Sequence, residues 1–252
     1  MKVAILGKIL KSEPTEYITK IIPLLEKKKV SVFLEFEYFK SLNGFISESV
    51  SSFKELDKSF DLLISIGGDG TILKAITFVK DLSIPIVGVN TGRLGFLAKI
   101  QIENIEQVIE EIILKNYSVS ERTLIEVSTS ETNQQLSKLN FALNEITLSR
   151  KNTTSMISID TKLDNKHLNS YWADGLIIST PTGSTGYSLS CGGPIIMPEA
   201  ENLIINPIAP HNLNARPLII PDSTEIKIKV NGREDEFLIS LDSRITTLSN
   251  SN

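Results

Sequence analysis

The stretch "DLLISIGGDGTILKAITFVK" (residues 61–80) decides the fold of the first half of the chain. Residues 61–67 are apolar on both faces, which is typical of a strand in a parallel sheet covered on both sides. A glycine-rich turn follows, and residues 71–80 have the pattern of a helix. Free backbone N–H groups and the positive end of a helix dipole meet at such a junction, which therefore suits an anion such as phosphate.

The flanking segments continue the alternation of strand and helix. Apolar runs at 3–7, 30–36 and 84–90 predict further strands. A helix with Ser12 as its N-cap is predicted by apolar residues at helical spacing, namely Tyr17, Ile18, Ile21, Ile22 and Leu25. We expect a weak helix around 48–57 and an amphipathic helix over 103–115. This order indicates an open, doubly wound α/β sheet.

From about residue 122 the pattern changes to short strand candidates that are separated by turn residues. Examples are "FALNEITLSR" (141–150), "MISIDTKL" (156–163), "GLIISTPTG" (175–183) and "EIKIKVNG" (225–232). Such spacing is typical of an all-β sandwich or a related layered sheet. The chain is therefore expected to have an α/β N-terminal domain and a β-rich C-terminal domain.

The composition excludes several classes of protein. The chain has 252 residues, a net charge of -4, one cysteine (Cys191) and two histidines. A general nucleic-acid binder normally has a basic face, and a disulfide framework or a cysteine-based zinc site needs more cysteines. The N-terminus reads as a strand rather than a signal peptide, and no apolar run is long enough to cross a bilayer. We expect a cytoplasmic protein that binds neither nucleic acid nor a membrane.

Asp69, inside the glycine turn, is the residue that needs an explanation. A carboxylate beside phosphates costs Coulomb energy unless Mg²⁺ or a proton taken from a hydroxyl offsets it. Both possibilities point to phosphoryl transfer, with Asp69 as a general base in the second. The alternative is that Asp69 only caps a helix that begins at Thr71.

Three further segments are candidates for ligand contacts. "TGRLGFLA" (91–98), in which two glycines flank Arg93 and Leu94, is either a tight turn or a second ligand-facing loop. Asn144 and Glu145 stand inside a strand pattern although both are poor strand formers. Either they bind a ligand, with the pair accepting ribose hydroxyls and the Asn144 amide suiting an adenine edge, or they mark a bulge or an exposed edge.

The third segment, 180–190, is rich in hydroxyls and glycines and suits a polar ligand. Tyr187 either stacks on a base or completes the core. Ser184 and Ser188 have no obvious His/Asp partners, which argues against a serine triad. We expect Cys191 to be a packing residue and His211 to be a structural hydrogen-bonding residue.

In combination these segments resemble the bacterial NAD kinases over nearly the whole chain. "GGDGT" (67–71) is shared with diacylglycerol and sphingoid kinases, whereas "NTGRLGFLA" (90–98), the Asn144–Glu145 pair and "DGLIISTPTGSTGYSLSCGGP" (174–194), in this order, are specific to NAD kinases. The resemblance implies a Rossmann-like domain over residues 1–98 and a β-sandwich over 99–252, with NAD between them. It also implies a homodimer or homotetramer.

The resemblance further implies ATP-dependent phosphorylation of the 2′-hydroxyl on the adenosine ribose of NAD, with Asp69 as general base and Mg²⁺ accompanying ATP. The phosphate loop would be Gly67, Gly68, Gly70 and Thr71. The residues implied in NAD binding are Asp69, Gly70, Lys74, Asn144, Glu145, Asp174, Thr182, Thr185, Gly186, Tyr187, Ser188, Leu189, Ser190 and Ala209. In known members the acid at the position of Asp174 often comes from a neighbouring subunit.

The sequence departs from that family at three places. Trp172 stands where many members have a polar or basic residue, and Gly186 replaces the more usual alanine. The chain stops at Asn252 where members normally continue, so we expect exposed sheet edges. Two other functions remain open: a lipid kinase, which would have an apolar substrate cleft instead of the hydroxyl-rich loop, and a nucleotide-binding regulator without catalysis.

Overall fold

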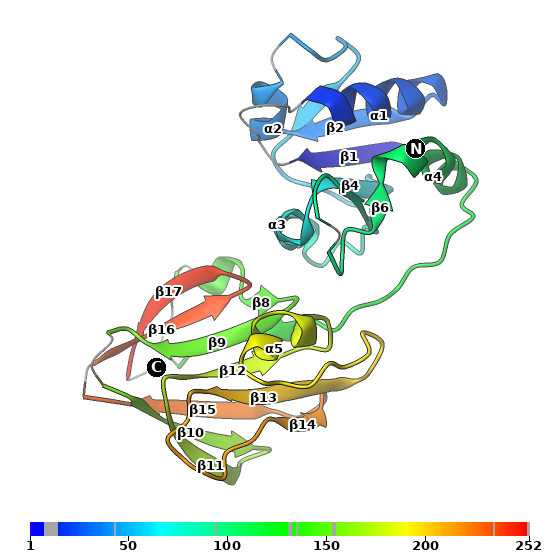
Figure 1. Cartoon of the computed structure of the whole chain (residues 1–252). Helices are drawn as coiled ribbons and strands as arrows, with labels where there is room; N and C mark the ends of the chain where they lie inside the picture. The colour runs from blue at the N-terminus through cyan, green and yellow to red at the C-terminus, as the bar shows by residue number, and fades with distance from the viewer. Residues whose placement is uncertain are drawn as a thin grey trace. The chain divides into compact units, whose positions relative to one another are not determined.

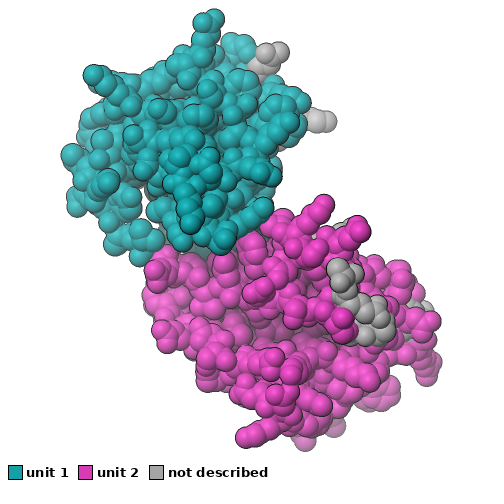
Figure 2. Space-filling view, turned by 180° about the vertical axis from the view of Figure 1, so that it is seen from behind, with its two compact units in different colours: residues 1–119 teal, residues 120–252 magenta. Residues whose placement is uncertain are grey.

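The computed structural model describes residues 1–7, 15–42, 44–93, 95–130, 133–134, 136–152, 155–233 and 235–250. It divides into two compact units, residues 1–119 and residues 120–252 (Figure 2). The expected N-cap, Ser12, and the loop residue Leu94 lie outside the described residues.

The first unit is built on a parallel sheet with the strand order β3-β2-β1-β4-β5-β6 among its described residues (Figure 1). The strands are β1 (Lys2–Gly7), β2 (Ser31–Glu35), β3 (Ser51–Phe53), β4 (Leu62–Gly67), β5 (Ile86–Asn90) and β6 (Ile100–Gln101). The order reverses between β1 and β4. In open α/β sheets, ligands bind outside the carboxyl ends of the strands at this switch point, which is where β4 delivers the glycine turn.

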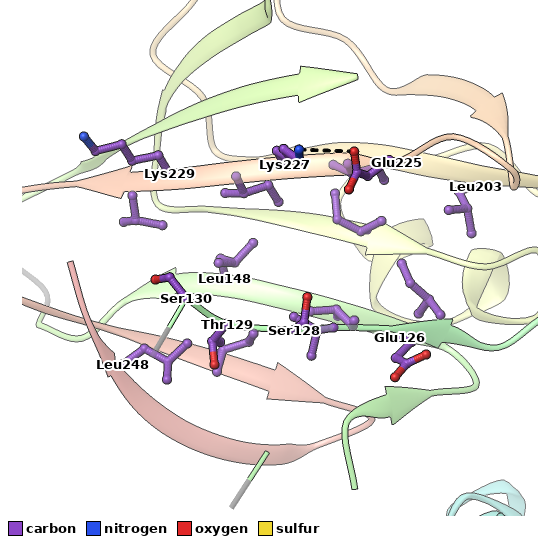
Figure 3. Close-up of a pocket in the computed structure, with 18 of the residues that line it drawn as sticks. Glu126, Ser128, Thr129, Ser130, Leu148, Leu203, Glu225, Lys227, Lys229 and Leu248 are labelled. Atoms are coloured by element: carbon purple, nitrogen blue, oxygen red, sulfur yellow. Dashed lines mark ion pairs between the residues drawn. The ribbon is translucent and has the colours of Figure 1, made fainter. Parts of the chain in front are cut away.

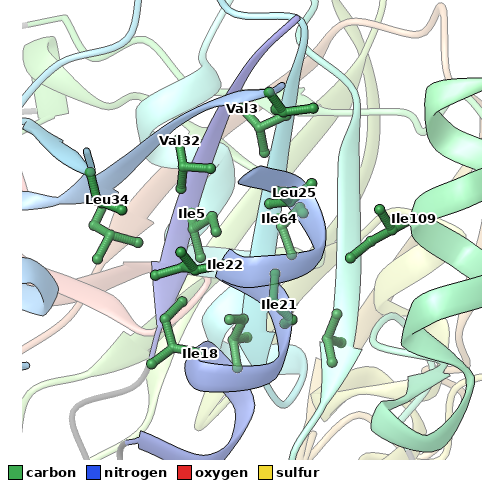
Figure 4. Packing of buried hydrophobic residues seen from close by; sticks show 14 of the residues in the cluster. Val3, Ile5, Ile18, Ile21, Ile22, Leu25, Val32, Leu34, Ile64 and Ile109 are labelled. Atoms are coloured by element: carbon green, nitrogen blue, oxygen red, sulfur yellow. The ribbon is translucent and has the colours of Figure 1, made fainter. Parts of the chain in front are cut away.

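Helices cover both faces of this sheet because successive strand residues point to opposite sides. Val3 and Ile5 of β1 pack against α1 (Thr15–Lys27), and α4 (Ile105–Ile113) adds Ile109 to the same core (Figure 4). Ala4 and Leu6 face the opposite side, in the cluster that includes Ala75 and Val79 of α3 (Asp69–Val79). The expected doubly wound α/β architecture is confirmed.

Two predictions for this unit need correction. Residues 48–57 contain β3 instead of a weak helix, because Ser51 to Phe53 pair with β2 and Phe53 packs against Phe60 and Phe78. A short helix, α2 (Phe36–Ser41), lies before them. The division between the units comes after residue 119, whereas we expected a boundary after residue 98. Residues 99–119 include η1 (Ile102–Asn104) and α4, whose apolar face belongs to the core of the first unit.

The second unit consists of antiparallel sheets. In the part of the chain that the structure describes, one sheet has the order β14-β13-β12-β9-β16-β17, a second has β11-β10-β15, and β7 pairs with β8. The strands are β7 (Ile125–Glu126), β8 (Phe141–Ala142), β9 (Glu145–Arg150), β10 (Ile157–Leu163), β11 (Lys166–Ala173), β12 (Gly175–Ser179), β13 (Asn202–Ile208), β14 (Leu218–Pro221), β15 (Ile226–Asn231), β16 (Glu236–Leu241) and β17 (Arg244–Ser249). The short helical turns are η2 (Leu136–Lys138), η3 (Thr182–Thr185) and α5 (Tyr187–Ser190).

The two larger sheets share one core, so the expected β-sandwich is confirmed. Leu148 and Ile178 of the larger sheet belong to the same buried cluster as Ile159 and Val230 of the smaller one. The alternate residues of the larger sheet point to its other face, which the segment carrying η3 and α5 covers (Figure 1). This explains why β12 is buried along its whole length.

Candidate active site

The glycine turn forms the junction between β4 and α3. Gly67 has a φ of 156°, and a Cβ built there would lie 2.1 Å from Thr71 Oγ1. Gly68 is the N-cap of α3 and makes no side-chain cap hydrogen bond. Since the first N–H groups of a helix have no partner within it, the turn presents backbone donors at the carboxyl edge of the sheet. This geometry supports the predicted phosphate loop.

The carboxylate of Asp69 turns away from its own helix and binds the loop that follows β5. Its Oδ2 accepts the N–H of Phe96 at 2.8 Å, and its Oδ1 accepts those of Leu97 and Ala98 at 3.0 Å each. The alternative that Asp69 only caps a helix beginning at Thr71 is therefore wrong, because the helix begins at Asp69 and its cap is Gly68. Charge-assisted bonds of this kind fix the carboxylate in one orientation.

The loop at 91–98 is held in place by Asn90, the last residue of β5. Asn90 Nδ2 donates to the carbonyl oxygens of Arg93 at 2.9 Å and Ala98 at 3.3 Å, and its Oδ1 accepts the N–H of Gly92 at 2.8 Å. Gly67 and Asn90 are paired at the ends of neighbouring parallel strands. The two glycine-containing segments thus meet at one edge of the sheet.

Lys74 lies one turn further along α3 and faces β2. Its Nζ is 3.8 Å from Oε2 of the buried Glu35, which also accepts the N–H of Tyr38 at 3.1 Å. Lys74 therefore stays at the carboxyl edge of the sheet, with its side chain directed to the end of β2 rather than bonded to Asp69.

Glu145 is the first residue of β9, an interior strand between β12 and β16, and Asn144 directly precedes it. The pairing of β9 with both neighbours is regular, so the alternatives of an exposed edge and of a bulge are wrong for Glu145. Asn144 is fixed by its carbonyl oxygen, which accepts the N–H of Thr180 at 2.9 Å and the hydroxyl of Ser179 at 3.3 Å. The pair therefore has a rigid backbone.

The side chain of Glu145 is enclosed on the face that carries the 180–190 loop. Burial, together with the nearby carboxylate of Asp242, raises the pKa of Glu145 to about 7. Its Oε2 is buried and has no hydrogen-bond partner among the described residues. An enclosed carboxyl with an unused oxygen is suited to accept hydroxyl groups of a ligand.

The 180–190 loop divides into a buried anchor and an exposed end. The Thr180 hydroxyl donates to the Leu143 carbonyl at 2.5 Å, Ser184 Oγ accepts the N–H of Ile196 at 3.0 Å, and Asn206 Nδ2 donates to the carbonyl of Ser188 at 2.8 Å. The hydroxyls of Thr180, Ser184 and Ser188 therefore hold the loop itself. Thr182 is buried as well, but its Oγ1 has no hydrogen-bond partner among the described residues.

The exposed end of the loop comprises Thr185, Gly186, Tyr187, Leu189 and Ser190, all of which are half-buried or exposed. A Cβ built at Gly186 would lie 3.4 Å from Glu145 Oε2 and 3.9 Å from Asn144 Nδ2. Tyr187 is 46% exposed, so of the two alternatives for this residue, completion of the core is wrong. The structure thus brings the loop end together with the Asn144–Glu145 pair.

Asp174 and Ala209 lie at neighbouring strand ends. The N–H of Asp174 donates to the carbonyl of Ile208 at 3.0 Å, and Ala209 follows with a left-handed φ of 44°. Asp174 Oδ2 is 3.1 Å from Arg150 Nη2, an ion pair that the sequence did not indicate. Burial is the main cause of the raised pKa of Tyr187, interaction with Cys191 follows, and the nearby Asp174 and Glu145 contribute less.

Trp172, Cys191 and His211 make contacts within the protein itself. The rings of Trp172 and His211 lie 5.3 Å apart, and the N–H of His211 donates to the Trp172 carbonyl at 2.8 Å. Burial raises the pKa of the Cys191 thiol, which disfavours the reactive thiolate. The raised pKa agrees with the packing role that we expected for Cys191. The hydrogen bond of His211 comes from its backbone, so a structural hydrogen-bonding role for its side chain stays a prediction.

A large pocket in the second unit is not the candidate site. It has a volume of about 880 Å³ and lies between the two sheets, with Leu148, Leu203 and Leu248 inside and the ion pair of Lys227 and Glu225 (3.3 Å) at its rim (Figure 3). None of the predicted site residues lines it. Ile146 and Leu148 face this pocket, whereas Glu145 points to the opposite side of β9.

Gly183→Ala is expected to destabilise the protein by about 2 kcal/mol, and Gly186→Ala by less than about 1 kcal/mol. A Cβ at Gly183 would lie 2.0 Å from the carbonyl oxygen of Asn144. This oxygen belongs to the backbone, so it can move away only at a large cost in free energy. At Gly186 the nearest atom is the Gly183 oxygen at 3.2 Å. Urea denaturation of the two variants makes the comparison, and equal losses would contradict the tight contact at Gly183.

Glu145→Gln is expected to stabilise the protein above neutral pH. Folding raises the pKa of Glu145 from 4.5 to about 7, so the ionised carboxylate is less favourable in the folded protein than in the unfolded chain. The carboxyl therefore costs no stability below pH 4.5, and the cost grows until it is complete once the pH has risen through 7. After allowance for solvent screening, the free energy of unfolding of the variant should exceed that of the wild type by on the order of 2 kcal/mol near pH 8.5 and match it near pH 4. Urea denaturation across this range measures the difference, and a constant difference would contradict the titration.

Comparison with known proteins identifies the family. The ATP-NAD kinase N-terminal domain matches residues 5–117, and the ATP-NAD kinase C-terminal domain matches residues 143–252. The NAD kinase of Flavobacterium psychrophilum is 54% identical over 255 residues, covering 99% of this chain and 87% of the relative. The chain belongs to the NAD kinase family. The NAD kinase of Bacteroides fragilis is 43% identical over 96% of this chain and 84% of its own length.

Solved structures of an NADH kinase and an NAD kinase have the same fold. Yeast NADH kinase complexed with NADH has a TM-score of 0.86 and 27% identity, with 98% of this chain and 76% of that chain covered. The NAD kinase of Archaeoglobus fulgidus in complex with ATP has a TM-score of 0.75 and 25% identity, with 99% and 86% covered. No helix in the described part of the chain is long and apolar enough to cross a membrane.

Proposed function

We propose that this member of the NAD kinase family transfers the γ-phosphoryl group of ATP to the 2′-hydroxyl on the adenosine ribose of NAD, giving NADP and ADP. The observation that carries the proposal is the carboxylate of Asp69. It is fixed by three backbone N–H groups beside a helix N-terminus, at the switch point of a parallel sheet. A carboxylate in such a place is suited to deprotonate a hydroxyl next to bound phosphate.

In the proposed step, Asp69 takes the proton of the 2′-hydroxyl as the ribose oxygen attacks the γ-phosphorus. The new oxygen–phosphorus bond forms, the bond from phosphorus to the β–γ bridging oxygen breaks, and that oxygen leaves with ADP. Gly67, Gly68, Gly70 and Thr71 would form the phosphate loop, with free backbone donors at the start of α3 holding phosphate oxygens. The N–H of Thr71 is not one of these donors, because it donates to the Gly68 carbonyl at 2.9 Å. The three bonds from residues 96–98 would keep the base in line with the hydroxyl.

The second unit would hold the adenosine. The Glu145 carboxylate is an acceptor for ribose hydroxyls, and the amide of Asn144 suits an adenine edge. The loop end around Gly186 and Tyr187 lies next to this pair, and Asp174 and Ala209 would complete the contacts. Lys74 would act from the first unit as a positive charge near phosphate, at the edge where Glu35 holds it.

Mg²⁺ would accompany ATP. Mg²⁺ bound to nucleotides commonly needs only one or two protein carboxylates besides the substrate phosphates. The ion would neutralise charge on the β- and γ-phosphate oxygens. A homodimer or homotetramer and a cytoplasmic location remain predictions.

The test is incubation of the protein with Mg-ATP and NAD, followed by detection of NADP with an NADP-specific dehydrogenase. NADP should form in step with ADP. Parallel reactions replace ATP with polyphosphate, NAD with NADH, or NAD with diacylglycerol. Phosphorylation of the lipid alone would favour the lipid kinase, and binding of NAD without turnover by folded protein would favour the non-catalytic regulator.

A further inference from the structure

The hairpin turn between β16 and β17 carries a carboxylate that the proposed chemistry does not use. Asp242 and Ser243 form a two-residue turn with left-handed φ values of 46° and 71°, between the paired residues Leu241 and Arg244. Asp242 is only 7% exposed. A buried charge is costly unless polar groups surround it, so its partners define its role.

The partners of Asp242 are the backbone groups of the Asn144–Glu145 segment. Its Oδ2 accepts the N–H of Leu143 at 2.6 Å, and its Oδ1 accepts those of Asn144 at 2.7 Å and Glu145 at 3.2 Å. The N–H of Asp242 donates in return to the Glu145 carbonyl at 3.2 Å. Four hydrogen bonds therefore tie the turn to three consecutive residues.

Arg244, at the other end of the turn, holds the segment that leads to this pair. Its Nη1 donates to the carbonyl oxygen of Leu139 at 3.0 Å, its Nη2 to that of Phe141, and its Nε to that of Leu241 at 3.1 Å. The planar guanidinium reaches all three carbonyls from one position, which an ammonium group cannot do. One turn thus fixes both the approach to β9 and its first residue.

We propose that Asp242 is a positioning residue for NAD: its carboxylate clamps the backbone of residues 143–145 and so sets where Asn144 and Glu145 meet the adenosine. This inference rests on the proposed function of the pair. Asp242 does not touch the reacting atoms in this scheme and acts through Asn144 and Glu145. Its removal should weaken NAD binding more than it slows phosphoryl transfer.

The clamp also has an electrostatic consequence. Among the described residues, Asp242 in the turn is the charge that acts on Glu145. Glu145 in turn acts on Tyr187 in α5, and Asp242 acts on Arg244. Asp242 contributes to the raised pKa of Glu145, after burial. Since ribose hydroxyls donate to the ionised form, NAD affinity should rise with pH through this titration, and loss of the Asp242 charge should move it to lower pH.

The test compares Asp242→Asn with Glu236→Gln, which removes a carboxylate charge from an exposed position on the same hairpin. Asp242→Asn should raise the KM for NAD about tenfold, change kcat and the KM for ATP less than about threefold, and shift the pH profile of the KM for NAD to lower pH. Glu236→Gln should leave all of these unchanged. A folded Asp242→Asn protein with an unchanged KM for NAD and an unchanged pH profile would overturn the inference.

A second, milder variant keeps the inference testable if Asp242→Asn does not fold. Arg244→Lys keeps the charge but loses the fork that reaches several carbonyls, and it should raise the KM for NAD about threefold with kcat unchanged. Equal effects on the constants for NAD and ATP in either variant would indicate general damage and contradict a positioning role. Absence of NADP formation by the wild-type protein would instead count against the proposed function itself.

Discussion

Asp69→Asn is expected to lower kcat for NADP formation by about 10³-fold while changing the KM for NAD less than about threefold. Asparagine keeps the size of the side chain but cannot take the proton of the ribose hydroxyl. Its amide nitrogen or oxygen can occupy the carboxylate positions, so the Leu97 and Ala98 N–H groups keep an acceptor at Oδ1. Steady-state kinetics with varied NAD separates the two constants.

The matched control is Asp81→Asn, which removes the same charge from an exposed position just beyond α3. It should leave kcat unchanged. Because the amide NH₂ of the asparagine introduced in place of Asp69 would face the Phe96 N–H, the melting temperature of that variant should be measured alongside the rates. Full activity of folded Asp69→Asn would refute the role of Asp69 as general base.

Gly95→Ala is expected to lower kcat by about 10²-fold, because a displacement of a catalytic group by about 1 Å is enough to cause such a loss. A Cβ built at Gly95 would lie 2.2 Å from Asp69 Oδ1 and 2.6 Å from Oδ2. The methyl group and the carboxylate cannot occupy these positions together. The carboxylate must therefore move from the orientation that the 96–98 amides give it.

Gly92→Ala in the same loop is the matched control for Gly95→Ala. A Cβ at Gly92 would have no atom within 4 Å among the described residues, and its φ lies outside the left-handed region. Kinetics and urea denaturation of both variants separate displacement of Asp69 from loss of stability. Equal activity of the two variants would contradict the contact between the loop and the base.

The spacing of apolar residues predicted most helices and strands of the first unit, because these elements are regular. The buried run at 62–67 and the apolar stripe of α1 both correspond to elements in the structure. The failure at 48–57 has a physical cause, since the short strand β3 is stabilised by pairing with β2 and by aromatic contacts of Phe53. Such long-range contacts override a weak local preference.

The candidate site was predictable to the extent that its residues were unusual in their local context. Asp69 stood out as a charge in a phosphate-type turn, and Asn144 and Glu145 as poor strand formers. Their partners did not stand out: Asp242 is a common type of turn residue, and it lies 98 residues from Asn144 in sequence. Backbone N–H groups, which hold Asp69, leave no signal in side-chain patterns.

The hydroxyl-rich loop shows where composition alone overstates function. Thr180, Ser184 and Ser188 are buried and bonded to backbone or to Asn206, so their hydroxyls stabilise the loop. The polar groups left for a ligand are those near Gly186 and Tyr187. Sequence does not separate the two sets, because serine and threonine satisfy buried backbone groups as readily as they bind ligands.

The position of the transferred phosphate is the most direct test of phosphoryl transfer to the 2′-hydroxyl. The product of a reaction with Mg-ATP and NAD should be purified and examined by phosphorus–proton NMR correlation. The expected result is one new phosphomonoester coupled to the 2′ proton of the adenosine ribose, formed in equal amount to ADP. A phosphate on the 3′ position or on the nicotinamide ribose, or no phosphorylated dinucleotide from folded protein, would contradict it.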